Sequence, residues 1–135
     1  MKRTGFVFAF MLLASAFARG ANGRAAWIGV WQGELDGQPS VTLTLEDDGG
    51  ELGGTVVLNV VERDDEGHAH VAAIEPHVLL RTRVEGKTLS FEAMRLNRSM
   101  APMHFSVTMG ADGRAWIHCL NCGTDAPVAV LTKDQ

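Results

Sequence analysis

Alternation of apolar and polar residues dominates the chain beyond residue 25 and constrains its fold more than any other feature. Val41, Leu43 and Leu45 alternate with two threonines and a glutamate, and the stretch 103–109 repeats this pattern. Such alternation is typical of antiparallel strands that bury one face and expose the other. No helical pattern of useful length accompanies it, so the sequence predicts an all-β domain.

Turn residues separate these strands at intervals of roughly 8 to 12 residues. The stretches 47–50, 85–86 and 112–113 carry glycines that supply the positive φ of tight hairpins. We therefore expect an up-and-down antiparallel meander of about eight or nine strands. A closed barrel is favoured because it leaves no apolar edge, and a two-sheet sandwich is the alternative. The expected strands cover residues 26–36, 40–46, 52–63, 68–75, 77–84, 87–96, 103–109, 114–120 and 127–133.

The first residues have the features of an export signal. Lys2 and Arg3 precede an almost wholly apolar run over 6–17, and residues 16–18 read Ala-Phe-Ala, a small-x-small cleavage pattern. The run is shorter than the ~20 residues that span a bilayer, so we expect no membrane-spanning segment. The predicted organisation is a signal peptide over 1–18, a linker over 19–25 and one β-barrel domain over 26–135. The expected location is the periplasm or the extracellular space.

The charge of the chain argues against a polyanionic partner. Cleavage after Ala18 would leave ten basic and sixteen acidic residues, a formal charge of −6. Nucleic-acid binding requires clustered lysine and arginine, whereas the arginines here are scattered among carboxylates. We therefore expect no nucleic-acid partner, and the sequence makes no prediction of the oligomeric state.

Gly29, Val30 and Trp31 lie on the first expected strand, and Lys133 lies at the end of the last one. This combination resembles the calycin barrels, which include the lipocalins and fatty-acid-binding proteins. The resemblance implies that Trp31 closes one end of the barrel and that Lys133 packs across it. A cation over an indole ring contributes ~0.5 to 2 kcal/mol. The resemblance also implies a container for a small molecule.

Two further resemblances cover parts of the chain. The Gly-Val-Trp stretch, Gly33, Gly37 and the stretch 50–55 resemble the opening hairpins of avidin-like barrels. Avidins surround biotin with tyrosine and tryptophan, and this chain has no tyrosine, so biotin is not the expected ligand. The stretches 31–35 and 84–92 resemble an uncharacterised domain that is common in exported bacterial proteins, and that resemblance implies no known activity.

Cysteine and histidine pairs are the candidates for redox or metal chemistry. Cys119 and Cys122 form the single CxxC, which in an exported protein favours a small disulfide over a redox or zinc site. His68 and His70 lie ~6.6 Å apart along one expected strand, a spacing that metal sites use. They stand next to a polar loop, however, so we expect solvent-facing side chains and neither metal nor cofactor.

The expected function is binding rather than catalysis. No serine-nucleophile elbow, zinc-protease motif or phosphate loop is present, although catalytic groups can also assemble from distant strands. We predict an exported, non-catalytic module for a small, apolar ligand or a surface partner. The alternatives are a structural domain with a filled core and a weak metal or redox protein. The side chains expected inside the barrel or near its mouth are Trp27, Leu80, Phe91, Phe105 and Trp116.

Overall fold

A computed structural model describes residues 23–124 and 126–134. The expected signal peptide and the first part of the linker lie outside these residues. Eight antiparallel strands form one closed barrel in chain order, and β8 pairs back onto β1. The predicted all-β meander is therefore confirmed, as a barrel and not as a sandwich. The strands are β1 (Gly29–Leu35), β2 (Gln38–Asp48), β3 (Glu51–Arg63), β4 (Ala69–Glu85), β5 (Thr88–Ala93), β6 (Met103–Met109), β7 (Ala115–Cys119) and β8 (Ala129–Lys133).

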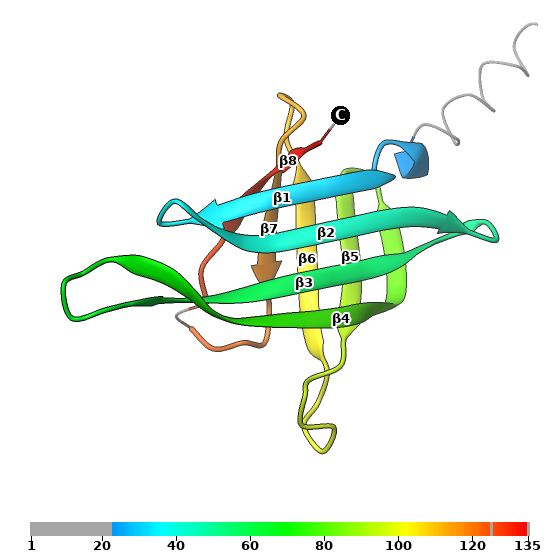
Figure 1. The fold of residues 1–135 in the computed structure, drawn as a ribbon. Helices are drawn as coiled ribbons and strands as arrows, with labels where there is room; N and C mark the ends of the chain where they lie inside the picture. Colours follow the sequence, from blue (N-terminus) through cyan, green and yellow to red (C-terminus); the bar gives the residue numbers. More distant parts are fainter. Residues whose placement is uncertain (1–22, 125, 135) are drawn as a thin grey trace, which may run out of the picture.

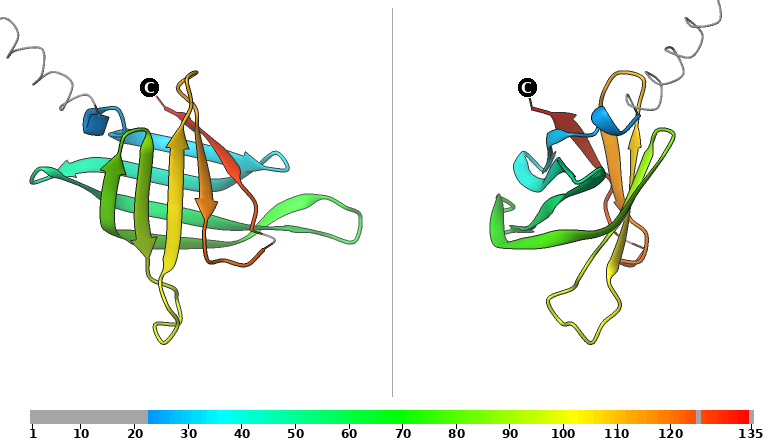
Figure 2. Two further views of the ribbon diagram at one scale, coloured as in Figure 1. Left: turned by 180° about the vertical axis from the view of Figure 1, so that it is seen from behind. Right: turned by 90° about the vertical axis from the view of Figure 1, so that its right-hand side faces the viewer.

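The barrel is flattened into two layers that cross steeply. β1 to β4 form the front layer in Figure 1, and β5 to β7 run behind them. The far ends of β3 and β4, residues 59–74, project beyond the barrel as an arm (Figure 2). The loop between β5 and β6 projects separately from the back layer. Within the described part of the chain, no helix has the length and apolar character needed to cross a membrane.

β4 is the element that the sequence predicts least well. Two strands were expected on either side of Pro76, but β4 is one strand of 17 residues. Pro76 pairs with Val57 of β3, and pairing with β5 begins only at Leu79. The proline therefore lies where β4 has one neighbour, and such edge positions tolerate a residue without an N–H. For this reason the barrel has eight strands, not nine.

The partner change in β4 takes place at a bulge. The register with β5 shifts between Leu80 and Arg83, and Arg81 adopts a left-handed φ of 52°. Thr82 Oγ1 donates a hydrogen bond to the Leu52 carbonyl of β3 and so links the two strands where their backbone pairing has ended. The bulge redirects β4 from the front layer to the back layer.

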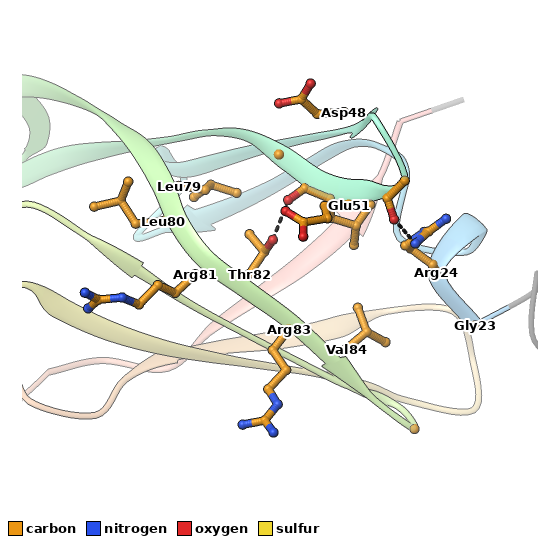
Figure 3. Close-up of a pocket in the computed structure, with 14 residues that line it drawn as sticks. Gly23, Arg24, Asp48, Glu51, Leu79, Leu80, Arg81, Thr82, Arg83 and Val84 are labelled. Atoms are coloured by element: carbon orange, nitrogen blue, oxygen red, sulfur yellow. Dashed lines mark hydrogen bonds between the residues drawn. The ribbon is translucent and has the colours of Figure 1, made fainter.

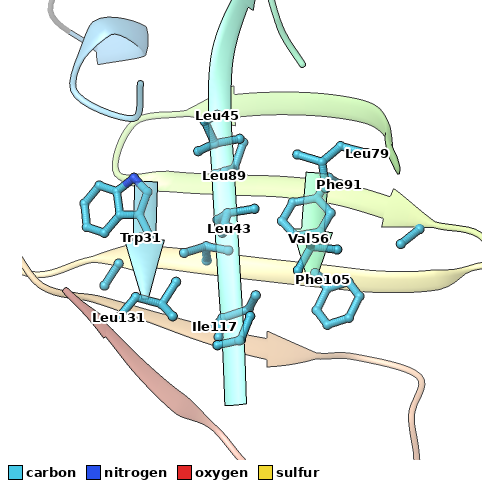
Figure 4. Close-up of a cluster of buried hydrophobic side chains, with 14 of the residues drawn as sticks. Trp31, Leu43, Leu45, Val56, Leu79, Leu89, Phe91, Phe105, Ile117 and Leu131 are labelled. Carbon is cyan, nitrogen blue, oxygen red and sulfur yellow. The ribbon is translucent and has the colours of Figure 1, made fainter. Parts of the chain in front are cut away.

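Side chains from every strand fill the middle of the barrel. Leu43, Val56, Leu89, Val107 and Leu131 are fully buried. Figure 4 shows that these aliphatic side chains interdigitate with aromatic rings between the two layers. The buried faces expected from alternation on β2 and β6 are confirmed. Most of the interior is therefore a packed core.

Candidate functional site

One end of the barrel is plugged by indole rings. Trp31 is 1% exposed, and its Nε1 donates a hydrogen bond of 2.9 Å to the Trp27 carbonyl. The two indole rings lie 5.6 Å apart between centroids. Lys133 Nζ lies 5.6 Å from the Trp31 ring centroid and donates a hydrogen bond of 3.1 Å to the Ala26 carbonyl. These contacts close this end of the barrel.

The opposite end holds an apolar pocket of about 210 Å³. It lies where β1 and β7 end and where β2, β6 and β8 begin, beside Leu58 and Asn59 of β3, so strands of both layers supply its walls. The disulfide between Cys119 and Cys122 forms one wall. The apolar side chains that define it are Val41, Leu58, Met103, Phe105, Ile117 and Ala129.

An aromatic pair forms the inner boundary of this pocket. Phe105 lines the pocket and stacks on Phe91, with ring centroids 5.1 Å apart and planes 21° apart. Phe91 is 2% exposed and lies deeper in the core. Ala129 of β8 lines the outer part of the pocket with only a methyl group. Large side chains thus fill the interior up to Phe105, and small ones leave space beyond it.

Two buried acceptors lie near the open end. Asn59 lines the pocket and donates from Nδ2 to the Pro39 carbonyl, while its Oδ1 has no hydrogen-bond partner among the described residues. His77 Nδ1 lies 2.7 Å from the Met94 carbonyl, which only accepts, so Nδ1 carries the proton. His77 Nε2 is buried and has no hydrogen-bond partner in the described chain, and Glu75 Oε2 lies 3.8 Å from it. Asn59 and Ser40 are the polar side chains in the otherwise mainly apolar lining of the pocket.

The structure does not bring the five predicted ligand-binding residues together. Phe105 lines the pocket, and Phe91 stacks behind it. Trp27 is buried at the opposite end, against Trp31. Only one of these three side chains is therefore in a position to touch a ligand at the open end.

Leu80 and Trp116 lie on the outer surface instead of inside the barrel. They are 38% and 39% exposed. Trp116 stands between two buried residues of β7, and Leu80 follows buried Leu79, so strand alternation turns both side chains outward. The expectation that Leu80 and Trp116 lie inside the barrel or near its mouth is therefore wrong.

Apart from Phe105, the side chains that define the pocket were not among the predicted ligand-binding residues: Val41, Leu58, Met103, Ile117 and Ala129. Alternation along β6 marks Met103 as buried, so a signal for this residue was available. Alternation gives no such signal for Leu58, which is half-buried and lies in the continuous apolar run 56–58. Leu58, Met103 and Ile117 come together at the open end because of how far each strand extends, and the sequence pattern does not show this.

The predicted disulfide is present, with Cα atoms 5.5 Å apart. The two candidate metal ligands are exposed: His68 has Nδ1 3.6 Å from Asp64 and 3.5 Å from Glu66, and His70 lies opposite Glu62. Across residues 23–124 and 126–134, no group of three or more histidine, cysteine or acidic side chains is placed to hold a metal ion.

A larger groove of about 840 Å³ lies on the outside of the barrel, where β4 leaves β3. Figure 3 shows Arg81, Arg83 and Arg24 around it, with Glu51 between them and Leu80 at one side. The lining of the groove is mainly polar, whereas the lining of the pocket at the open end is mainly apolar. Sites for small molecules are mostly apolar, so the smaller pocket is the better candidate despite its size.

Comparison of the chain with protein-family models, with curated proteins and with solved structures found no match. The class that the geometry defines is a small eight-stranded antiparallel barrel, compatible with the calycin type. The two ends of this barrel differ: one is closed by Trp27 and Trp31, and the other holds the apolar pocket.

Proposed function

We propose that this protein is an exported, calycin-like barrel that binds one small apolar molecule in the pocket at its open end. The observation that carries the proposal is the size and lining of that pocket, about 210 Å³ bounded by Leu58, Phe105 and Ile117. An apolar cavity of about 150 Å³ accommodates one benzene molecule. The pocket therefore suits a single ring with a short substituent, or a short aliphatic chain.

The calycin assignment is supported by the plugged end. Trp31 and Lys133 come from the first and last strands and are paired residues where β1 and β8 close the barrel. Gly29 allows this contact, because a Cβ there would lie 2.7 Å from Lys133 Cε. The arrangement agrees with the pair that the resemblance implied.

Export is supported by two observations of different kinds. The chain begins with a cationic and then apolar stretch that ends in Ala-Phe-Ala at residues 16–18. The Cys119–Cys122 disulfide favours an oxidising compartment, because disulfides form and persist there. We include cleavage after Ala18 in the proposal.

Methyl NMR during a titration with toluene tests the binding proposal. We expect saturable shifts of the Ile117 and Met103 methyl signals, because both side chains line the pocket. The signals of Leu43 and Leu131, which are fully buried in the packed core, should not change. Shifts that increase without saturation at all concentrations would contradict a defined site.

A matched pair of variants distinguishes this pocket from other apolar surface. Ala129→Leu places a larger side chain in the pocket and should weaken toluene binding about tenfold or more. Ala73→Leu makes the same change at an exposed position of the arm and should leave binding unchanged. Equal binding by both variants would exclude the open-end pocket as the site.

A structural domain without a ligand is the second candidate function. It is favoured by the packed interior, in which eighteen apolar residues are buried, and by the small size of the remaining pocket. This candidate predicts no saturable shifts with toluene or with longer aliphatic probes. The same titration therefore decides between the two.

A further inference from the structure

The loop between β5 and β6, residues 94–102, carries apolar side chains that nothing in the described chain covers. Leu96 is 72% exposed, Met100 is 51% exposed and Met94 is 39% exposed. The loop leads into Met103, which lines the apolar pocket, so it lies at the pocket end of the barrel. Figures 1 and 2 show it projecting beyond the strands. Single exposed apolar residues are ordinary, but three within seven residues of one projecting loop are a local concentration.

The charge of this loop is opposite to that of the chain as a whole. The protein has a formal charge of −4, yet no aspartate or glutamate occurs between Glu92 and Asp112. That acid-free stretch contains Arg95 and Arg98, both within the loop. Along the chain, the exposed apolar side chains of the loop are therefore flanked by arginines.

The loop is held in its projecting shape by polar contacts. Arg95 Nε donates to the Ala101 carbonyl at 2.9 Å, and its Nη2 donates to the Asn121 carbonyl at 3.0 Å. Asn97 Oδ1 accepts from the Ser99 amide at 3.1 Å and tightens the tip. Through these hydrogen bonds, Arg95 connects the base of the loop to the neighbouring loop after β7. Leu96, Arg98 and Met100 are left at the tip, facing solvent.

We propose that this loop docks the protein on an anionic lipid surface, with Leu96 and Met100 entering the interfacial region and Arg98 meeting the headgroups. Apolar side chains flanked by cations bind the membrane interface through burial and through attraction to anionic lipids. A lipid surface is favoured over a protein partner because the side chains project from a narrow tip rather than line a groove. This inference is independent of ligand binding in the pocket.

Sedimentation with vesicles tests the docking. The full chain is mixed with vesicles of phosphatidylglycerol and phosphatidylcholine in equal parts, and with vesicles of phosphatidylcholine alone. The wild type should bind the mixed vesicles and lose most binding on the neutral ones, because attraction to anionic lipid is removed. Arg98→Gln should weaken binding to the mixed vesicles about fivefold. Equal binding to both vesicle types would overturn the proposal.

A pair of double variants matched in exposure shows whether the loop is the docking element. Leu96→Ser with Met100→Ser should weaken binding about tenfold or more. Ile74→Ser with Val78→Ser removes two apolar side chains that are 66% and 67% exposed on β4, and should leave binding unchanged. Retained binding by the loop variant, through any other part of the chain, would contradict the assignment.

The location of the contact can be read directly from the wild type. With a gadolinium-chelating lipid in the mixed vesicles, the methyl signals of Leu96 and Met100 should broaden before those of Ile74 and Val78. Uniform broadening, or broadening that begins at Ile74 and Val78, would place the contact elsewhere and refute the proposal. Failure of the protein to bind the mixed vesicles would also refute it and would favour a protein partner for this loop.

Discussion

At the scale of single residues, the closed end depends on three positions that are distant in sequence. Gly29 has a φ of 137°, and a Cβ there would lie 2.7 Å from Lys133 Cε. Because glycine has no Cβ, the Lys133 side chain can pass Gly29 and reach the Trp31 ring. This contact was expected from the resemblance to the calycin barrels, and the pairing of the first and last strands brings its two residues together. The second indole, Trp27, was expected near a ligand, since the sequence does not show that the chain before β1 folds back over the barrel end.

Lys133→Met tests the energetic contribution of the cation. The methionine retains most of the apolar stem but not the charge or the hydrogen bond to Ala26. We expect the free energy of unfolding to fall by ~1 kcal/mol, the usual range for a cation over an indole ring. Urea denaturation followed by tryptophan fluorescence measures the change.

Lys87→Met is the control, because Lys87 is an exposed residue of the turn before β5. This variant should have the stability of the wild type. An equal loss in both variants would attribute the effect to the general charge of the protein and not to the Trp31 contact.

At the scale of elements, β4 shows where local sequence signals fail. Pro76 predicts an interruption of the strand that does not occur. At Pro76, β4 pairs with β3 alone, and a strand at such an edge position tolerates a residue without an N–H. The real irregularity lies at Arg81, which carries no local turn signal. It arises because β4 must leave β3 and join β5, and that requirement comes from closure of the barrel. Hairpin turns, in contrast, were predictable because their glycines act within a few residues.

Two substitutions of Arg81 test whether this backbone conformation is strained. Arg81→Ala and Arg81→Gly both remove the ion pair with Glu92, but only glycine tolerates a left-handed φ without strain. We expect the glycine variant to be more stable than the alanine variant by ~1 kcal/mol. Thermal unfolding monitored by circular dichroism compares them.

The same two substitutions at Arg83 provide the reference, since Arg83 has no positive φ. There the order should reverse, with glycine less stable than alanine by ~0.5 to 1 kcal/mol. The same order at both positions would show that Arg81 is not strained.

At the scale of the whole molecule, the barrel is asymmetric along its axis. Trp27 and Trp31 fill one end, the stacked Phe91 and Phe105 lie further in, and the apolar pocket lies beyond Phe105. Strand order, closure and buried faces were predictable from turns and alternation. The position of the pocket was not, because free volume depends on side-chain sizes summed over several strands. No single stretch of sequence contains that sum.

A crystal structure determined under xenon pressure tests the asymmetry most directly, because xenon occupies dry apolar cavities. The account predicts xenon in contact with Phe105 and Ile117 at the open end, and none between Trp27 and Trp31. A pocket filled by side chains or by ordered water, or xenon bound only at the tryptophan end, would contradict it.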